Sequence, residues 1–146
     1  MSLYQLIYCS KRVISAEDDS GVTVDVEQLL IQARRNNELV DVSGLLYFGS
    51  EYYLQCLEGS PSAVNSVYNK IISDSRHSDI VLIDYRQIAK RAYSNWDMAY
   101  VKESSMTESL IKLYAGGSKF NPLDMSVESV MQLMQTFKSC LTVVDA

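Results

Sequence analysis

The fold is decided by a central segment with the sequence VSGLLYFGSEYYLQCL, residues 42–57. Residues 42–48 and 52–57 are mostly apolar and aromatic, as strands are, and residues 49–51 between them form a short turn. Because so short a connection joins neighbouring strands that run in opposite directions, the segment predicts an antiparallel hairpin.

A strand and a helix are expected before this hairpin. Residues 4–9 lack helical periodicity and contain several β-favouring residues, which predicts a strand. Asp25 is the expected N-cap of a helix, with Gln28 at capping-box spacing. Apolar residues then recur at helical spacing, and the polar residues 34–37 are expected to end the helix.

A second helix and further strands are expected after the hairpin. Ser60 is the expected N-cap and Pro61 the first helical residue, followed by apolar positions at helical spacing up to residue 72. Residues 80–83 are apolar without alternation, which favours a strand covered on both faces. Residues 99–101 are expected to form a short additional strand.

The resulting order is β-α-β-β-α-β with a fifth short strand, which predicts an α+β, ferredoxin-like sandwich with two helices on one face of a mixed sheet. The other face needs a cover, and the C-terminal segment supplies candidates. Residues 107–114 predict a short helix, and a second helix has an apolar stripe at helical spacing. We expect these two C-terminal helices to cover the other face of the sheet; alternatively, the methionine-rich final helix binds a partner. The stripe consists of Val127, Val130, Met131, Met134 and Phe137.

Composition excludes several functional classes. Thirteen basic against eighteen acidic residues give a net charge of -5, which argues against direct binding of nucleic acid. The sequence shows neither a membrane-length apolar run nor a secretory signal, so we expect no membrane association and a cytoplasmic location. The three cysteines are odd in number and are expected to be reduced. His77 is the only histidine, so we expect no metal site and no Ser-His-Asp hydrolase.

Polar residues in expected core segments are the strongest functional signal. Gln55 lies in a strand that should be substantially buried, and burying an amide costs free energy unless it is hydrogen-bonded. The topology brings Gln55 close to Tyr8 and Asn37, which together offer one phenol and two amides. This set suits hydrogen bonding to a planar, polar heterocycle. Taken singly, each residue also has a structural explanation: a solvent-facing strand residue, a core tyrosine and a helix C-cap, respectively.

Five spaced motifs lie within residues 3–101. They are LIYCS at residues 6–10, RNN and VSGLL at 35–37 and 42–46, YLQCLEG at 53–59, DSRH at 74–77 and RAYSNWDM at 91–98. In this order and spacing they resemble the BLUF family of blue-light sensors that use a flavin. The resemblance implies the same ferredoxin-like sandwich, with the flavin ring held between the two helices.

The resemblance implies a role for each matching residue. Tyr8 would be the photochemical donor of an electron and a proton, and Gln55 would lie between Tyr8 and the flavin. Asn37 would bind the O4/N3 edge of the ring, with Asn36 nearby. The other implied residues are Lys70, Arg76 and His77 around the far edge and side chain of the flavin, and Trp96 and Met98 as the pair that reports the photochemical change.

The resemblance also implies a domain plan and partners. Residues 1–101 would form the flavin-binding domain, and residues 102–146 a helical extension within the same globular unit. The cofactor would be FAD, with FMN as the alternative. The chain then resembles short members without an enzymatic output domain, which self-associate and signal to a downstream regulatory protein. We expect it not to be an enzyme, and we take the methionine-rich helix as the candidate surface for both kinds of partner.

Three other functions stay open from the sequence. A ferredoxin-like binding module without photochemistry would bind no flavin and would expose Gln55. An acylphosphatase-like enzyme would need an anion cradle of backbone amides beside an arginine, and the loop after the first strand offers no glycine-bearing cradle. A flavin redox enzyme would use pyridine nucleotides, for which the sequence has no fingerprint.

Overall fold

Five strands form one mixed sheet in the order β4-β1-β3-β2-β5. The computed structural model describes residues 2–13, 24–49, 51–75, 77–93, 99–102, 105–115 and 120–144. β2 and β3 form the predicted antiparallel hairpin, and β5 pairs with β2 in parallel. The strands are β1 (Leu3–Arg12), β2 (Ser43–Phe48), β3 (Tyr52–Gly59), β4 (His77–Ile88) and β5 (Ala99–Lys102).

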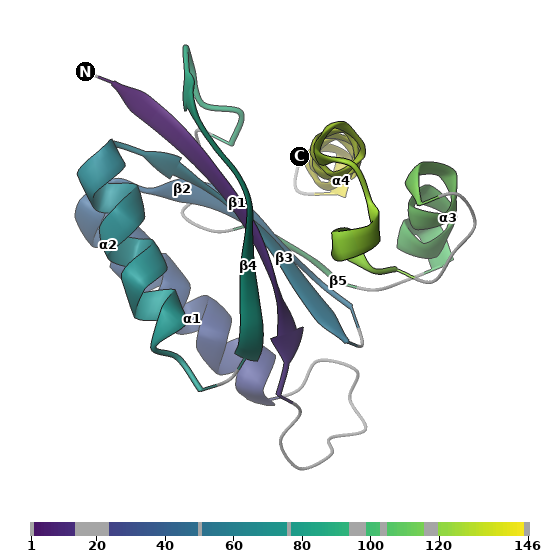
Figure 1. Ribbon diagram of the computed structural model, residues 1–146, viewed down its shortest axis with the longest axis horizontal. Helices are drawn as coiled ribbons and strands as arrows, with labels where there is room; N and C mark the ends of the chain where they lie inside the picture. The colour runs from purple at the N-terminus through teal and green to yellow at the C-terminus, as the bar shows by residue number, and fades with distance from the viewer. Residues whose placement is uncertain are drawn as a thin grey trace.

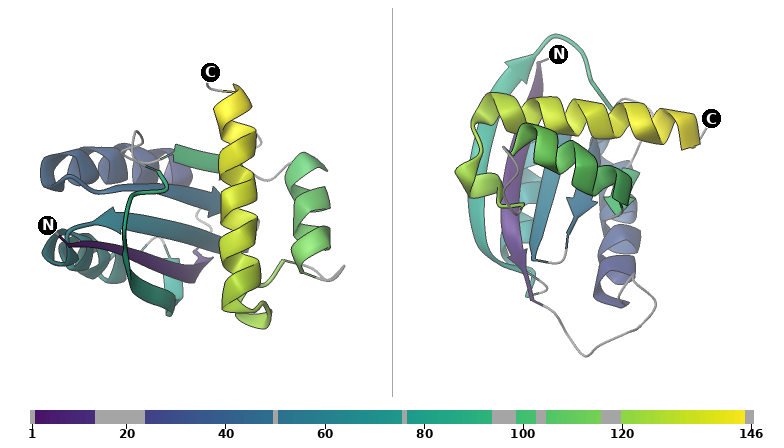
Figure 2. Two further views of the ribbon diagram at one scale, coloured as in Figure 1. Left: turned by 90° about the horizontal axis from the view of Figure 1, so that it is seen from above. Right: turned by 90° about the vertical axis from the view of Figure 1, so that its right-hand side faces the viewer.

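Helices cover both faces of this sheet (Figure 1). One face carries α1 (Val24–Val40) and α2 (Pro61–Ile72), and we call it the α1/α2 face. The other carries α3 (Ser105–Tyr114) and α4 (Val127–Val144), joined through the short 3-10 helix η1 (Pro122–Asp124), and we call it the α4 face. Figure 2 shows α4 running across the strands, with α3 beside it. The α+β sandwich with two C-terminal helices on the second face is therefore confirmed.

Strand alternation separates neighbouring residues onto the two faces. Leu6 and Tyr8 belong to the cluster of buried residues under α1 and α2. Ile7 and Cys9 belong to the cluster under α4. Because successive side chains of a strand point to opposite faces, each central strand contributes to both clusters.

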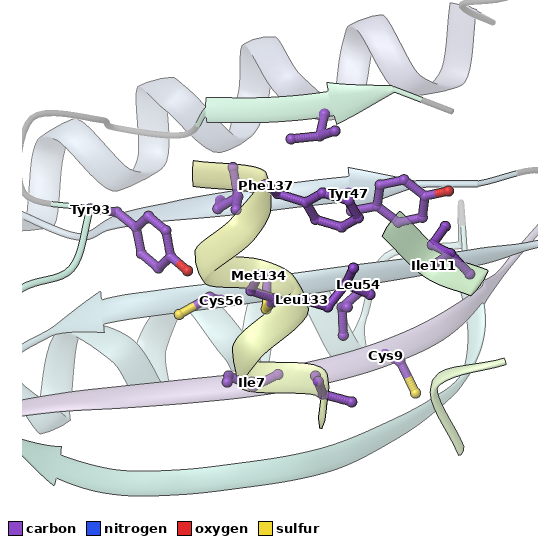
Figure 3. Close-up of a cluster of buried hydrophobic side chains, with 13 residues drawn as sticks. Ile7, Cys9, Tyr47, Leu54, Cys56, Tyr93, Ile111, Leu133, Met134 and Phe137 are labelled. Atoms are coloured by element: carbon purple, nitrogen blue, oxygen red, sulfur yellow. The ribbon is translucent and has the colours of Figure 1, made fainter. Parts of the chain in front are cut away.

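The α4 face is closed by tightly packed apolar and aromatic side chains (Figure 3). The rings of Tyr47 and Phe137 stack with their centroids 4.9 Å apart. Met134 is 1% exposed, and Met131 is partly buried against the same cluster. These methionines therefore pack on the sheet, as we predicted for the C-terminal helices, and the alternative that the methionine-rich helix is the surface for partners does not hold for Met131 and Met134.

The predicted end of α1 is wrong. Residues 34–37 were expected to close the helix, but it continues to Val40. The N–H of Val42 donates to the carbonyl of Asn37 at 2.9 Å, and that of Asp41 donates to Glu38 at 3.4 Å. These two bonds form a Schellman cap, in which Asp41, with φ of 57°, occupies the left-handed position usually taken by glycine. At the other ends, α1 begins one residue before its predicted N-cap, Asp25, which therefore lies inside the helix, and α3 begins two residues before the predicted residue 107.

The prediction that residues 80–83 are covered on both faces is also wrong. β4 lies at the edge of the sheet and pairs only with β1. Val81 and Leu82 are 38% and 48% exposed. An apolar run without alternation therefore belongs here to a long edge strand, whose pairing with β1 is interrupted by two register shifts.

Candidate functional site

Tyr8 and Gln55 form a buried hydrogen-bonded pair in the middle of the sheet. They lie directly opposite each other in the antiparallel pairing of β1 with β3. The hydroxyl of Tyr8 donates to Oε1 of Gln55, and the two residues are 1% and 4% exposed. The pair predicted from the sequence is thus brought into direct contact, on the α1/α2 face.

Tyr8 keeps its proton in this environment. Burial, more than the neighbouring Tyr53 and Tyr68, raises the pKa of the Tyr8 phenol well above its ordinary value of 10.0. The ring of Tyr68 lies 5.6 Å from that of Tyr8, measured between centroids. Tyr8 is therefore a neutral hydrogen-bond donor at any physiological pH.

A pocket opens between α1 and α2 directly above Gln55. Its floor is Gln55 on β3, and its walls come from the two helices and the turn after α2. Tyr8 is not part of the lining, so Gln55 lies between Tyr8 and the pocket. The lining residues are Gln32, Ala33, Asn36, Asn37, Gln55, Val67, Lys70, Ile71 and Asp74.

The lining chemistry fits a flat aromatic ring system with a polar edge. Ala33, Val67 and Ile71 provide apolar walls, while four amide side chains provide both donors and acceptors. The cavity has a volume of about 50 Å³ and is open to the surface on one side.

The other predicted site residues divide into two groups. Asn37 is fully buried, Asn36 is half-buried and Lys70 is exposed, and all three line the pocket. His77 begins β4, where its backbone pairs with Arg12. Arg76, Trp96 and Met98 lie outside the described residues, as does the side chain of His77.

Sequence reasoning did not assign Gln32 and Asp74 to the site. Gln32 lies four residues before Asn36 on α1, and Asp74 lies four residues after Lys70. Residues four apart share one side of a helix, so the spacing from Asn36 was the available signal for Gln32. Asp74 lies beyond the end of α2, and its signal was the DSRH motif at residues 74–77.

Two other kinds of site were searched for in the described part of the chain. No group of three or more His, Cys, Asp and Glu side chains there could hold a metal ion. None of the helices described above is long and apolar enough to cross a membrane.

Comparisons with family models and with solved structures both identify similar proteins. Residues 3–99 match the family model BLUF, described as sensors of blue-light using FAD. The solved structure of BlsA in its photo-activated state superposes with a TM-score of 0.80 at 28% identity, covering 92% of this chain and 93% of that chain.

Curated relatives are longer proteins. The blue light- and temperature-regulated antirepressor BluF of Escherichia coli strain K12 is 32% identical over 108 residues, covering 70% of this chain and 26% of that protein. The photoactivated adenylate cyclase subunit beta of Euglena longa is 30% identical over 124 residues, covering 84% of this chain and 13% of that protein. The chain thus matches about a quarter or less of the length of either relative.

Proposed function

Because this chain belongs to the BLUF family of blue-light sensors that use a flavin, we propose that Tyr8 and Gln55 form its photochemical pair. The observation that carries this proposal is the hydrogen bond from the Tyr8 hydroxyl to a glutamine that forms the floor of the pocket. A bound flavin supplies absorption of blue light and, once excited, a strong oxidant. Tyr8 supplies an electron together with the proton of its hydroxyl.

In this proposal Gln55 relays the proton of Tyr8 and ends in a changed hydrogen-bonding state. Its amide is both a donor and an acceptor, so it can accept a proton from Tyr8 on one side and donate on the other. When the electron and proton return, Gln55 is left in a rearranged or tautomeric state. A stronger hydrogen bond from Gln55 to the ring then lowers the excitation energy, which produces a red-shifted absorption without net chemistry.

The remaining pocket residues bind and orient the cofactor in this proposal. Asn37 and Asn36 hydrogen-bond the polar edge of the ring and the chain attached to it. Lys70 lies at the open side of the pocket, where Arg76 and His77 would complete the contacts to the far edge and the side chain. We propose FAD as the cofactor, since the family description names it, with FMN as the alternative.

The output is proposed to be a change in protein contacts. Residues 1–101 would hold the cofactor, and residues 102–146 would respond to it, with Trp96 and Met98 reporting the photochemical change. Two relatives are named as an antirepressor and as a cyclase subunit. We therefore propose that this chain senses light without catalysing a reaction, self-associates and signals to a regulatory protein, without contacting nucleic acid directly, in the cytoplasm.

The first test is the visible spectrum of protein purified in the dark, recorded before and after blue light. A flavin spectrum that shifts reversibly to the red supports the proposal. A colourless protein that also refuses added flavin would overturn it in favour of a plain binding module. A yellow protein that only bleaches would indicate flavin redox chemistry instead.

Matched variants test the pair itself. Tyr8→Phe and Gln55→Ala should each abolish the red shift. Tyr4→Phe on the same strand and Gln87→Ala at the exposed sheet edge should keep it, because neither residue lines the pocket. A full red shift in Tyr8→Phe would remove Tyr8 from the mechanism.

A further inference from the structure

Glu58 is a buried carboxylate on the strand that carries Gln55. It lies on β3, three residues after Gln55, and is 0% exposed. A carboxylate out of contact with water is unfavourable unless hydrogen-bond donors surround it. The groups that donate hydrogen bonds to the Glu58 carboxylate are therefore the groups that Glu58 holds in place.

Three donors converge on the Glu58 carboxylate. Gln5 Nε2 donates to one oxygen at 2.9 Å from the neighbouring strand β1. The backbone N–H groups of Ala92 and Tyr93 donate at 3.0 and 2.9 Å. Glu58 thus ties the segment that follows β4 to the centre of the sheet.

Arg91 also connects the segment after β4 to the sheet, through hydrogen bonds to backbone carbonyls and to Ser43. Its guanidinium donates to the carbonyl of Glu58 at 3.1 Å and to the hydroxyl of Ser43 at 3.0 Å. It also donates to the carbonyl of Asp41 at 2.8 Å. Residues 91–93 are consequently fastened to the ends of both hairpin strands, immediately before the segment that contains Trp96.

Tyr93 carries this connection to α4. It is 3% exposed and belongs to the cluster under α4 that also contains Cys56 and Met134 (Figure 3). The ammonium group of Lys138 on α4 lies 5.8 Å from the centroid of the Tyr93 ring. The backbone that Glu58 holds therefore positions a ring on which α4 packs.

Gln5, the side-chain donor to Glu58, also carries an unsatisfied acceptor. Its Nε2 donates to Glu58, whereas its Oε1 is buried without a hydrogen-bond partner among the described residues. That side chain borders a small cavity of about 20 Å³, whose lining includes Tyr93, Met134 and Gln135. Since an unsatisfied buried carbonyl is unfavourable, this contact is a weak point in the packing between Glu58 and α4.

We propose that Glu58 is a positioning residue that couples the Gln55 strand to the packing of α4 through Ala92 and Tyr93. The inference rests on the proposed function, because it assigns a route by which a change at Gln55 leaves the site. A displacement of β3 at Gln55 moves Glu58, and Glu58 moves the backbone that sets the Tyr93 ring against α4. This route crosses the sheet and is separate from the Trp96 and Met98 pair.

The test compares backbone hydrogen exchange in the dark and in blue light for the holoprotein, Glu58→Gln and Asp84→Asn. Asp84→Asn is the matched control, because it makes the same chemical change to a carboxylate that is bonded only by the Arg86 side chain in the described contacts. Glu58→Gln should keep the red shift, since Glu58 does not line the flavin pocket. It should speed exchange at Ala92 and Tyr93 by roughly tenfold or more, because an amide replaces a charged acceptor.

The deciding readout is the light-minus-dark difference in exchange along α4. We expect this difference in the wild type and in Asp84→Asn, and its reduction by at least half in Glu58→Gln. An unchanged difference in Glu58→Gln, or a wild type that shifts to the red without any difference in α4, would overturn the route and leave the photochemical proposal intact. A wild type without a red shift would overturn both.

A second variant covers the case in which Glu58→Gln does not fold. Gln5→Met removes one of the three donors and leaves the two backbone bonds, so it should reduce the α4 difference less than Glu58→Gln while keeping the red shift. Exchange of the Ala92 and Tyr93 amides in wild-type protein is an independent check. If both exchange in the dark as fast as exposed loop amides, Glu58 does not hold them and the proposal is wrong.

Discussion

The two faces of the sheet differ in how their side chains satisfy burial. The α4 face is filled mainly by apolar and aromatic side chains, with Tyr47 stacked on Phe137 at its centre. The α1/α2 face buries a phenol and amides, and it keeps a pocket between its helices. The same strands build both faces, because alternation sends Gln55 to one and its neighbour Cys56 to the other.

The two faces of the sheet therefore have different roles. The α4 face mainly stabilises the fold, and the α1/α2 face carries the proposed photochemical site. Close packing on the α4 face contributes favourable burial of mainly apolar side chains, and the polar side chains of Gln5 and Glu58 that are buried there bond to each other and to backbone N–H groups. Polar groups on the α1/α2 face are stable only as a hydrogen-bonded set, and such a set can adopt a second arrangement. We therefore expect substitutions on the α4 face to lower stability with the photochemistry intact, and substitutions at the pocket to do the reverse.

The largest expected effect on stability is that of Phe137→Ala. Phe137 is 0% exposed, so the substitution removes a stacked ring and leaves a cavity. The free energy of unfolding should fall by about 3–5 kcal/mol, measured by urea denaturation. The folded fraction should keep its full red shift. A red shift that disappears in folded Phe137→Ala protein would break the separation between the faces.

The next prediction concerns alkaline pH and the thiols on the α4 face. Burial raises the pKa of Cys9 from 9.0 to about 11, and it also raises the pKa of Cys56. Between pH 9 and 11 the unfolded chain loses thiol protons that the folded chain retains, so the free energy of unfolding should decrease as pH rises through this range. Urea midpoints at pH 8, 9 and 10 measure the decrease, and Cys9→Ala should make it shallower. Stability that is constant or increases over this range would contradict the sign.

Tyr8→Phe should reverse the pattern of Phe137→Ala. The ring stays packed, but Oε1 of Gln55 loses its Tyr8 donor, so we expect a loss of about 1–2 kcal/mol together with loss of the red shift. Urea denaturation and light-minus-dark spectra on the same samples provide both numbers. A loss of stability equal to that of Phe137→Ala would show that the α1/α2 face also carries the main packing energy.

Much of this contrast could be predicted from the sequence, because it depends on local alternation. The hairpin at residues 42–57 and the unusual placement of Gln55 in a buried strand both follow from the pattern of residues within one segment. Helical spacing of apolar residues likewise predicted a C-terminal stripe that covers the second face. These features needed only the spacing of side chains along one segment.

Features that depend on distant partners could not be predicted in this way. The burial of Glu58 is compensated by Ala92 and Tyr93, which lie 34 and 35 residues away, so no local pattern marks it. The exposure of β4 depends on its position at the sheet edge, which an apolar run does not reveal. The extension of α1 depends on a cap that uses aspartate in place of the usual glycine.

That cap gives the smallest predicted effect, and one that belongs only to the α1/α2 side. Asp41 adopts φ of 57°, where a Cβ atom is unfavourable, and its exposed side chain forms an ion pair with Arg91 that water screens. Asp41→Gly should therefore raise the free energy of unfolding by about 0.5 kcal/mol, whereas Asp41→Ala, which keeps Cβ without the polar side chain, should lower it. Urea denaturation of the two variants beside the wild type measures the difference in sign. Equal destabilisation by both would assign the role of Asp41 to its ion pair with Arg91, and the helix that carries Asn36 and Asn37 would then depend on the segment held by Glu58 instead of on its own backbone cap.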